Sequence, residues 1–157
     1  MSAPVTESRL TRRFEKLKEK DRAALVTFIT ANDPDPAVFR QLLEGLPTAG
    51  ADIIELGMPF SDPMADGPSV QLSSQRALKV GVTIDDVLSA VSDMREWEVD
   101  TPVILMGYYN PIYRYGPAEF AEAAANAGVD GVIIVDDWSN AASSMPSGWE
   151  TLEALVH

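Results

Sequence analysis

Cysteine is absent from the 157-residue sequence, and histidine occurs once, at His157. Without cysteine there is no disulfide framework and no thiolate ligand for a metal. A single terminal histidine also argues against imidazole-based catalysis and metal binding. The composition therefore predicts a protein without a metal site.

Basic residues are scarce, because 12 Lys and Arg stand against 24 Asp and Glu, and the formal net charge is −12. A chain of this sign is repelled by nucleic acid and by anionic membrane surfaces. Apolar runs near the roughly 20 residues of a membrane-spanning helix are also missing. Met1–Leu10 is polar and lacks the apolar segment of a signal peptide. We therefore expect a cytoplasmic protein that binds neither nucleic acid nor membranes.

What the sequence does contain is an alternation of two hydrophobic patterns. Short apolar runs are separated by segments of helical spacing, which is typical of βαβ units around a parallel sheet. The chain is long enough for one such domain. The predicted strands, all parallel and in chain order, are Ala24–Thr30, Ile53–Gly57, Val103–Gly107 and Gly131–Asp136. The predicted helices cover residues 6–21, 36–50, 69–81, 83–97 and 117–128.

Details within these helices are also predicted. Thr6 or Ser8 is placed to cap the first helix, and Thr83 the fourth. In the second helix, one apolar stripe is expected from Val38, Leu42, Leu43 and Leu46.

The junction between helix and strand occurs twice in similar form, as "AGADIIELG" and "AGVDGVIIVD". In each copy a glycine closes the helix and an aspartate, Asp52 or Asp130, begins the strand. This pattern indicates a repeated β/α unit, although a common helix-to-strand turn produces it without shared ancestry.

Two α/β architectures fit this order, an open doubly wound sheet and part of a (β/α)8 barrel. The segment "TANDPDP" after the first strand contains no glycine, which argues against nucleotide binding at that loop. The informative loops follow the second and third strands. Both architectures place their chemistry at the carboxyl ends of strands.

Glu55 lies within the second predicted strand, on the same face as Ile53 and Gly57. An unpaired carboxylate is unfavourable to bury, and desolvation raises the pKa of a carboxyl group towards values suited to proton transfer. The structural alternative is a carboxylate paired with a buried arginine or a backbone amide. No Arg or Lys occurs between Arg40 and Arg76, so no local partner is evident. We therefore expect Glu55 to be functional.

The other candidates are weaker on their own. Asp62 and Asp66 lie in "SDPMADGP", where an aspartate commonly hydrogen-bonds its own backbone in a turn. Tyr108 follows the third strand and lines a pocket or belongs to the core. Asp136, at the end of the fourth strand, repeats the placement of Glu55 and is a candidate to orient a ligand or another residue.

Several segments together resemble the alpha subunit of tryptophan synthase, namely "RFEKLK", "ALVTFITANDPDP", "AGADIIELGMPFSDPMADGPSVQ", "RALKVGVT", "PVILMGYYNPIYRYG" and "AGVDGVIIVD". Of these, "ELGMPFSDPMADGP" is highly specific. The resemblance runs from about Arg13 to Asp136. It implies an α/β fold of the TIM or (β/α)8 barrel family, with residues 1–136 forming only about the first four β/α units.

The resemblance also implies an activity and a partner. The family is a lyase that cleaves indole-3-glycerol phosphate to indole and glyceraldehyde 3-phosphate, a retro-aldol step of tryptophan biosynthesis. Its partner is the beta subunit, in a tetramer of two alpha and two beta subunits. Pyridoxal phosphate belongs to the beta subunit, so no cofactor or metal is implied for this chain.

Two acids acquire roles from the resemblance. Glu55 matches the family's general acid/base, which delivers a proton to the indole C3 and removes one from the C3′ hydroxyl. Asp66 matches the acid that hydrogen-bonds the indole N–H and stabilises the positive charge that develops there.

Four further positions match by the same resemblance. Phe28 and Tyr108 match positions that line the indole pocket. Asp62 and Asn110 match positions near the contact with the beta subunit. One departure is Asn32, where the family usually has glycine.

After Asp136 the sequence leaves the family pattern. The segment "DWSNAASSMPSGWETLEALVH" has no strand pattern, where the family continues with four further β/α units. We expect residues 137–157 to be a divergent tail, whether by frameshift, truncation or natural variation, with a helix at most over Trp149–Val156. The family holds the substrate phosphate on loops after later strands, and four strands cannot close a barrel. Two functions stay open: a lyase alpha subunit, or a catalytically inactive half-barrel that at most binds a beta subunit.

Overall fold

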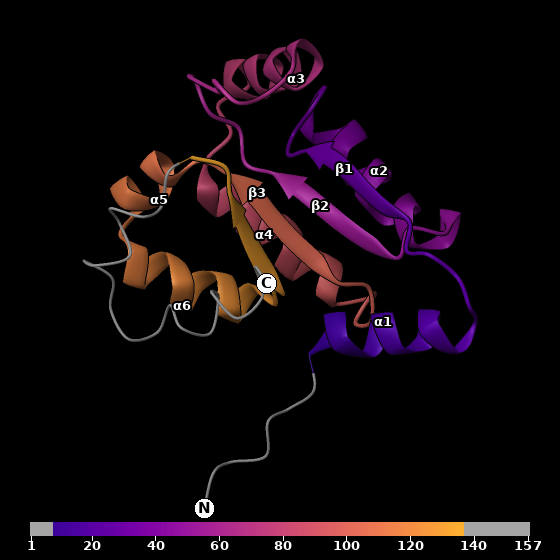
Figure 1. Ribbon diagram of the computed structural model, residues 1–157. Coiled ribbons are helices and arrows are strands. Elements are labelled where there is room, and N and C mark those ends of the chain that lie inside the picture. The colour runs from indigo at the N-terminus through magenta and orange to yellow at the C-terminus, as the bar shows by residue number, and fades with distance from the viewer. Residues whose placement is uncertain (1–7, 137–157) are drawn as a thin grey trace, which may run out of the picture.

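The computed structural model describes residues 8–136, in which helices and strands alternate around one sheet (Figure 1). The strands are β1 (Val26–Thr30), β2 (Ile53–Gly57), β3 (Val103–Gly107) and β4 (Gly131–Ile134). The helices are α1 (Arg9–Glu19), α2 (Pro36–Ala49), α3 (Pro68–Lys79), α4 (Ile84–Arg95), α5 (Tyr109–Tyr115) and α6 (Pro117–Ala127). The predicted tail and its helix lie outside the described residues.

The sheet has the predicted topology. Its four strands pair in the order β1-β2-β3-β4, and every pair is parallel. Two strand boundaries differ from prediction by two residues, because β1 begins at Val26 and β4 ends at Ile134. The register places Glu55 between Phe28 of β1 and Ile104 of β3.

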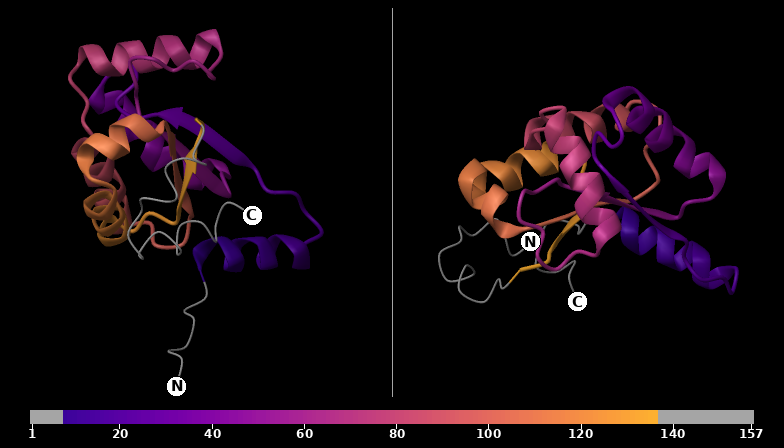
Figure 2. Two further views of the ribbon diagram at one scale, coloured as in Figure 1. Left: turned by 60° about the vertical axis from the view of Figure 1, so that its left-hand side comes forward. Right: turned by 90° about the horizontal axis from the view of Figure 1, so that it is seen from above.

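The hydrophobic core lies between the sheet and the helices of one face. Ile54 and Leu56 of β2 and Leu105 of β3 are fully buried there, together with Phe39 of α2 and Phe120 of α6. Figure 2 shows α2, α4 and α6 gathered on this side of the sheet. Side chains alternate along each strand, so Glu55 points to the opposite, concave face.

The predicted apolar stripe of α2 is partly wrong. Phe39 and Leu43 are buried and Leu46 packs against the core, whereas Val38 and Leu42 are 39% and 45% exposed. Positions 39, 43 and 46 recur at the spacing of one helical face. The aromatic Phe39, absent from the predicted stripe, sets which face turns inward.

Helix starts follow the predicted capping chemistry. The Ser8 hydroxyl accepts the N–H of Thr11 at the start of α1. Thr83 caps α4 within a capping box, in which the Asp86 carboxylate accepts the Thr83 N–H at 2.8 Å. The short helix α5 was not predicted, because "YNPIYRY" has few residues and carries Pro111 in its first turn, where proline is tolerated.

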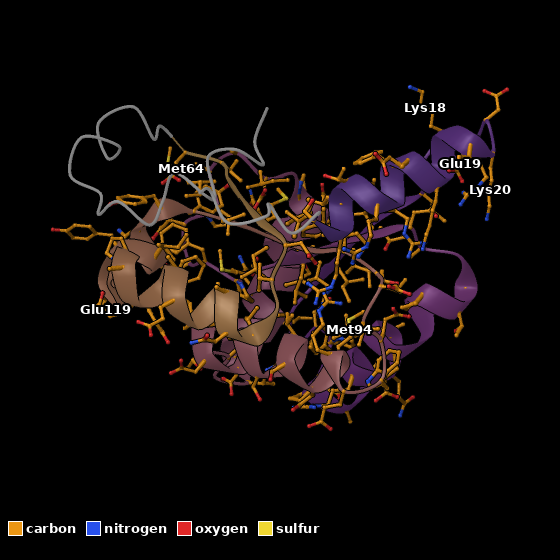
Figure 3. The ribbon with its side chains drawn as sticks, turned by 90° about the horizontal axis from the view of Figure 1, so that it is seen from below. Lys18, Glu19, Lys20, Met64, Met94 and Glu119 are labelled. Carbon is orange, nitrogen blue, oxygen red and sulfur yellow. The ribbon has the colours of Figure 1, made fainter. Side chains whose placement is uncertain are left out.

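Helix α1 crosses the amino ends of the strands (Figure 1), where Asp52 closes the junction between α2 and β2. The Asp52 carboxylate accepts two hydrogen bonds from the Arg22 guanidinium, at 2.6 and 2.9 Å, and one from the Leu25 N–H at 2.8 Å. Arg13 of α1 lies 3.7 Å away. The hydrogen bond from Arg22 lowers the pKa of Asp52, against the opposing effect of burial. In Figure 3, Lys18, Glu19 and Lys20 project outward from the far end of α1.

Asp130 repeats this construction at the junction between α6 and β4. Its carboxylate accepts the Val103 N–H at 2.9 Å, the Arg95 guanidinium at 2.8 Å and the Arg9 guanidinium at 2.9 Å. In both junctions an aspartate binds a backbone amide at the start of the preceding strand and at least two arginines. We call these two groups, Asp52 with Arg13 and Arg22 and Asp130 with Arg9 and Arg95, the amino-end ion clusters. The sequence motif that occurs twice therefore forms the same arrangement of aspartate, arginines and backbone amide twice.

Candidate active site

Glu55 lies on the concave face of β2 and is half-buried. Within residues 8–136 its carboxylate has no hydrogen bond and no ion-pair partner. Its neighbours across the sheet are Phe28 and Ile104, which are apolar. Among the described residues, Glu55 therefore has none of the contacts by which a carboxylate stabilises a fold.

The loop that follows β2 carries the other predicted acids. Asp62 is exposed, and its carboxylate accepts the Ser61 hydroxyl at 2.9 Å. Asp66 is half-buried, and its N–H donates to the Pro63 carbonyl at 3.1 Å, which closes a tight turn. Met64, at the tip of this turn, is 91% exposed. The turn therefore directs Asp66 inward and leaves Asp62 and Met64 in solvent.

Tyr108 is buried at the carboxyl end of β3 and reaches the same loop. Its hydroxyl oxygen accepts the Ala65 N–H at 2.9 Å, and its ring packs on Phe60 with centroids 5.3 Å apart. Burial raises the pKa of Tyr108; the hydrogen bond from the Ala65 N–H lowers it, and the neighbouring Asp66 carboxylate raises it. The net shift is upward, so Tyr108 stays a neutral hydroxyl at physiological pH.

A small hollow brings three predicted site residues together. Phe28, Asp66 and Tyr108 line it, with Gly57 and Gly107 at the ends of their strands. Its enclosed space of about 10 Å³ is close to what one water molecule requires.

A Cβ at position 57 would lie 2.7 Å from the tip of the Phe28 ring, so glycine lets this ring lie against β2. Glu55 is not among the described residues that line the hollow. It pairs with Phe28 in the sheet and lies two residues before Gly57, which does line the hollow.

Asp62 and Asn110 lie on the rim instead. Both are exposed, Asp62 in the loop after β2 and Asn110 in the first turn of α5. Neither lines the hollow in the part of the chain that the structure describes. Their predicted contact with a partner stays a prediction.

Two further residues contact the backbone near the site, and the sequence indicated only one of them, Asp136, as a candidate. The Gln71 side-chain amide donates to the Asp66 carbonyl at 2.8 Å, and the only sequence signal is its place in the first turns of α3. The Asp136 carboxylate accepts the Tyr109 N–H at 2.7 Å and so caps α5. Asp136 was expected to orient a ligand or a residue, and it orients the backbone beside Tyr108.

Residues 8–136 contain no group of three His, Cys, Asp or Glu side chains placed to hold a metal ion. Nor does this range contain a helix whose length and apolarity suit a membrane crossing.

The fold and the site define the class of protein. Four parallel β/α units, with a core under the helices and polar residues at the carboxyl ends of the strands, form half of a (β/α)8 barrel.

Comparisons with known proteins identify the family. A family model, "Tryptophan synthase alpha chain", matches residues 14–151. The tryptophan synthase alpha chain of Caulobacter sp. (strain K31) is 56% identical over 132 residues, which are 84% of this chain and 48% of that relative. The chain belongs to the tryptophan synthase alpha chain family. It spans about half the length of the curated relatives it matches.

Solved structures agree. The crystal structure of tryptophan synthase subunit alpha from Legionella pneumophila str. Paris superposes with a TM-score of 0.86 at 45% identity, over 91% of this chain and 55% of that one. Tryptophan synthase from M. tuberculosis, in the open form with BRD0059 bound, gives a TM-score of 0.83 at 34% identity, over 91% and 57%. The sequence match passes Asp136, so the boundary of the divergent tail stays a prediction.

Proposed function

We propose that this chain carries the first half of an active site that cleaves indole-3-glycerol phosphate to indole and glyceraldehyde 3-phosphate. The observation that carries the proposal is Glu55, a half-buried carboxylate without a partner among residues 8–136 on the concave face of the sheet. The aspartates at the opposite ends of the strands are fully paired. A site that must move protons needs a carboxyl group whose proton is not tied to a neighbour.

The reaction breaks the bond between C3 of the indole and C3′ of the glycerol chain. Glu55 gives a proton to the indole C3 and removes the proton of the C3′ hydroxyl, which becomes the aldehyde carbonyl. The electrons of the broken bond restore the aromatic indole ring. Asp66 accepts the indole N–H and stabilises the positive charge that forms on the ring after protonation at C3.

Phe28 and Tyr108 supply apolar walls for a flat aromatic ring. An indole needs far more room than one water molecule, so the proposed pocket includes the open concave face beside the hollow. Glu55 lies on that face, two residues before Gly57 at the hollow. This arrangement would place the ring between the two acids.

The proposal includes a partner and a compartment. The solved M. tuberculosis relatives include a tryptophan synthase in an aminoacrylate-bound form. By analogy we propose that this chain binds a tryptophan synthase beta chain in a cytoplasmic tetramer, with Asp62 and Asn110 at the contact. Pyridoxal phosphate would belong to the beta chain.

A second candidate is a half-barrel that binds a beta chain without catalysis. The small enclosed volume beside Asp66 favours it, because the described residues alone do not form a closed pocket for indole. Both candidate functions include binding of a beta chain through Asp62 and Asn110, and only the first includes release of indole.

The test joins residues 1–136 to the carboxyl-terminal half of the 56% identical Caulobacter relative and measures indole release with a beta chain present. We expect release from the joined chain, its loss in Glu55→Gln, and none from the 157-residue chain. Asp93→Asn is the matched control, because Asp93 is an exposed carboxylate on α4. Release that survives Glu55→Gln would contradict the proposed role. A folded joined chain that binds the beta chain and releases no indole would favour the second candidate.

A further inference from the structure

We propose that Tyr108 and Gln71 are positioning residues that hold the segment Asp62–Asp66 through contacts from two different elements and fix the direction of the Asp66 carboxylate. We call this segment the Asp66 loop. The inference rests on the proposed function of Asp66 and extends it to two residues that touch the loop.

The loop has little to hold it by itself. Met64 is 91% exposed, and Asp62 and Ala65 are also exposed. Its internal hydrogen bonds are two, from the Met64 N–H to the Asp62 carbonyl at 2.8 Å and from the Asp66 N–H to the Pro63 carbonyl at 3.1 Å. Segments with few buried apolar contacts open locally at low free energy. A catalytic carboxylate needs a position fixed to within about 0.5 Å, so external contacts must supply the order.

Tyr108 is the first contact. Its hydroxyl oxygen accepts the Ala65 N–H at 2.9 Å, and the Asp66 carboxylate lies beside the same hydroxyl. A neutral phenol both accepts and donates one hydrogen bond, so Tyr108 serves the amide of one residue and the carboxylate of the next. The Asp136 carboxylate holds the adjacent Tyr109 N–H at 2.7 Å, which fixes the backbone from which Tyr108 projects.

Gln71 of α3 is the second contact. Its amide nitrogen donates to the Asp66 carbonyl at 2.8 Å and lies 3.5 Å from the Pro63 carbonyl. Its helix is tied to the sheet by the buried pair of hydroxyls of Ser73 and Thr30, 2.7 Å apart.

A second tie lies one turn further along α3. The Arg76 guanidinium binds the Asp33 carboxylate after β1 through two hydrogen bonds, at 2.7 and 2.9 Å. Figure 1 shows α3 above the carboxyl end of β1. Gln71 therefore connects the loop to β1, as Tyr108 connects it to β3.

The experiment uses NMR on the 157-residue chain without substrate and reads two signals, the exchange rate of the Ala65 amide and the carboxyl ¹³C resonance of Asp66. Tyr108→Phe keeps the ring and removes the hydroxyl, so we expect Ala65 exchange to accelerate about tenfold and the Asp66 resonance to shift. Gln71→Met keeps the length and removes the donor, so we expect the Asp66 resonance to shift with a smaller change at Ala65. Tyr113→Phe is the matched control, because Tyr113 is 65% exposed, and it should change neither signal.

Exchange of the Leu105 amide in the core reports global stability and should stay unchanged. Unaltered Ala65 and Asp66 signals in a folded Tyr108→Phe chain would overturn the proposal, as would equal changes in the Tyr113→Phe control. If Tyr108→Phe does not fold, Gln71→Met decides, and an unshifted Asp66 resonance then overturns it. Indole release is not read here, so a failure of the proposed lyase function leaves these signals intact and the two failures are distinguishable.

Discussion

Glu55 on the concave face differs from Asp52 and Asp130 at the amino ends of the strands in the partners of its carboxylate. At the amino ends, Asp52 and Asp130 each bind arginine side chains and a backbone amide of the neighbouring strand. On the concave face towards the carboxyl ends, Glu55 has none of these partners within residues 8–136. The aspartates at the amino ends therefore stabilise the fold through these contacts, whereas Glu55 gains no such contact, and its role in chemistry is our proposal.

Arg95 illustrates how thoroughly the amino end is connected. Its guanidinium donates to the backbone carbonyls of Gly128, Glu98 and Thr101 as well as to the Asp130 carboxylate. One side chain thereby joins the end of α4 to the starts of β3 and β4. Substitution of an amino-end aspartate should therefore lower stability, whereas substitution of Glu55 should lower activity.

Glu55→Gln should have the largest effect, on activity alone. In the chain joined to the Caulobacter carboxyl-terminal half, we expect indole release to fall by about 10²–10⁴-fold, because glutamine keeps the shape and cannot transfer protons. Steady-state indole formation with a beta chain present measures it. A loss below threefold would place the acid/base elsewhere.

Asp130→Ala should break the amino-end ion cluster of β4. It leaves the largely buried Arg95, whose side chain is 11% exposed, without its carboxylate, and loss of one partner of a buried pair destabilises a protein by about 3–5 kcal/mol. Asp93→Ala is the matched control, since the Arg40–Asp93 pair is half-exposed and should contribute less than about 1 kcal/mol. Urea unfolding of the 157-residue chain gives both free energies. Equal losses in the two variants would contradict the contrast.

Asp52 predicts a dependence of stability on pH. Its folded pKa lies below the ordinary value of 3.8, because Arg22 hydrogen-bonds the ionised form. The carboxylate therefore stabilises the fold above the unfolded pKa of about 4 and loses this contribution as the pH falls through the lower folded pKa.

Urea unfolding between about pH 6 and pH 3 should show a flatter decline for Asp52→Asn than for the unsubstituted chain. Parallel curves for the two proteins would mean that Asp52 and Arg22 are not coupled in solution.

Thr83→Ala should have the smallest effect. The threonine caps α4 near the carboxyl ends of the strands, and loss of such a cap destabilises by about 1 kcal/mol. Thr83→Ser retains a hydroxyl and serves as the control. Thermal unfolding that leaves Thr83→Ala and Thr83→Ser indistinguishable would show that the cap makes no measurable contribution.

Much of the fold was predictable because the local signals agree with it. The four apolar runs are continuous and bounded by turns, so strand order and direction followed from them. The orientation of α2 was not predictable, since Val38 and Leu42 are as apolar as the residues that face the core. Only packing against the sheet selects Phe39 and Leu43.

The placement of Glu55 was predictable because its signal in the sequence is local. Glu55 was expected on an apolar strand without a nearby base, and the structure places it there. The hydrogen bond between Tyr108 and Ala65 joins residues 43 positions apart in the sequence, and the hydrogen bond between Arg9 and Asp130 joins residues 121 positions apart. Such pairs arise from the way the strands bring distant residues together, and the sequence contains no local pattern for them.

The most direct test of the contrast between Glu55 and the amino-end aspartates is the free energy of unfolding of Glu55→Gln in the 157-residue chain, measured with urea. If Glu55 has no structural partner, replacing its charge with a neutral amide should leave the chain at least as stable as before. A loss of more than about 1 kcal/mol, the contribution of a typical hydrogen bond, would contradict the account, because it would mean that Glu55 is held in the fold as Asp52 and Asp130 are.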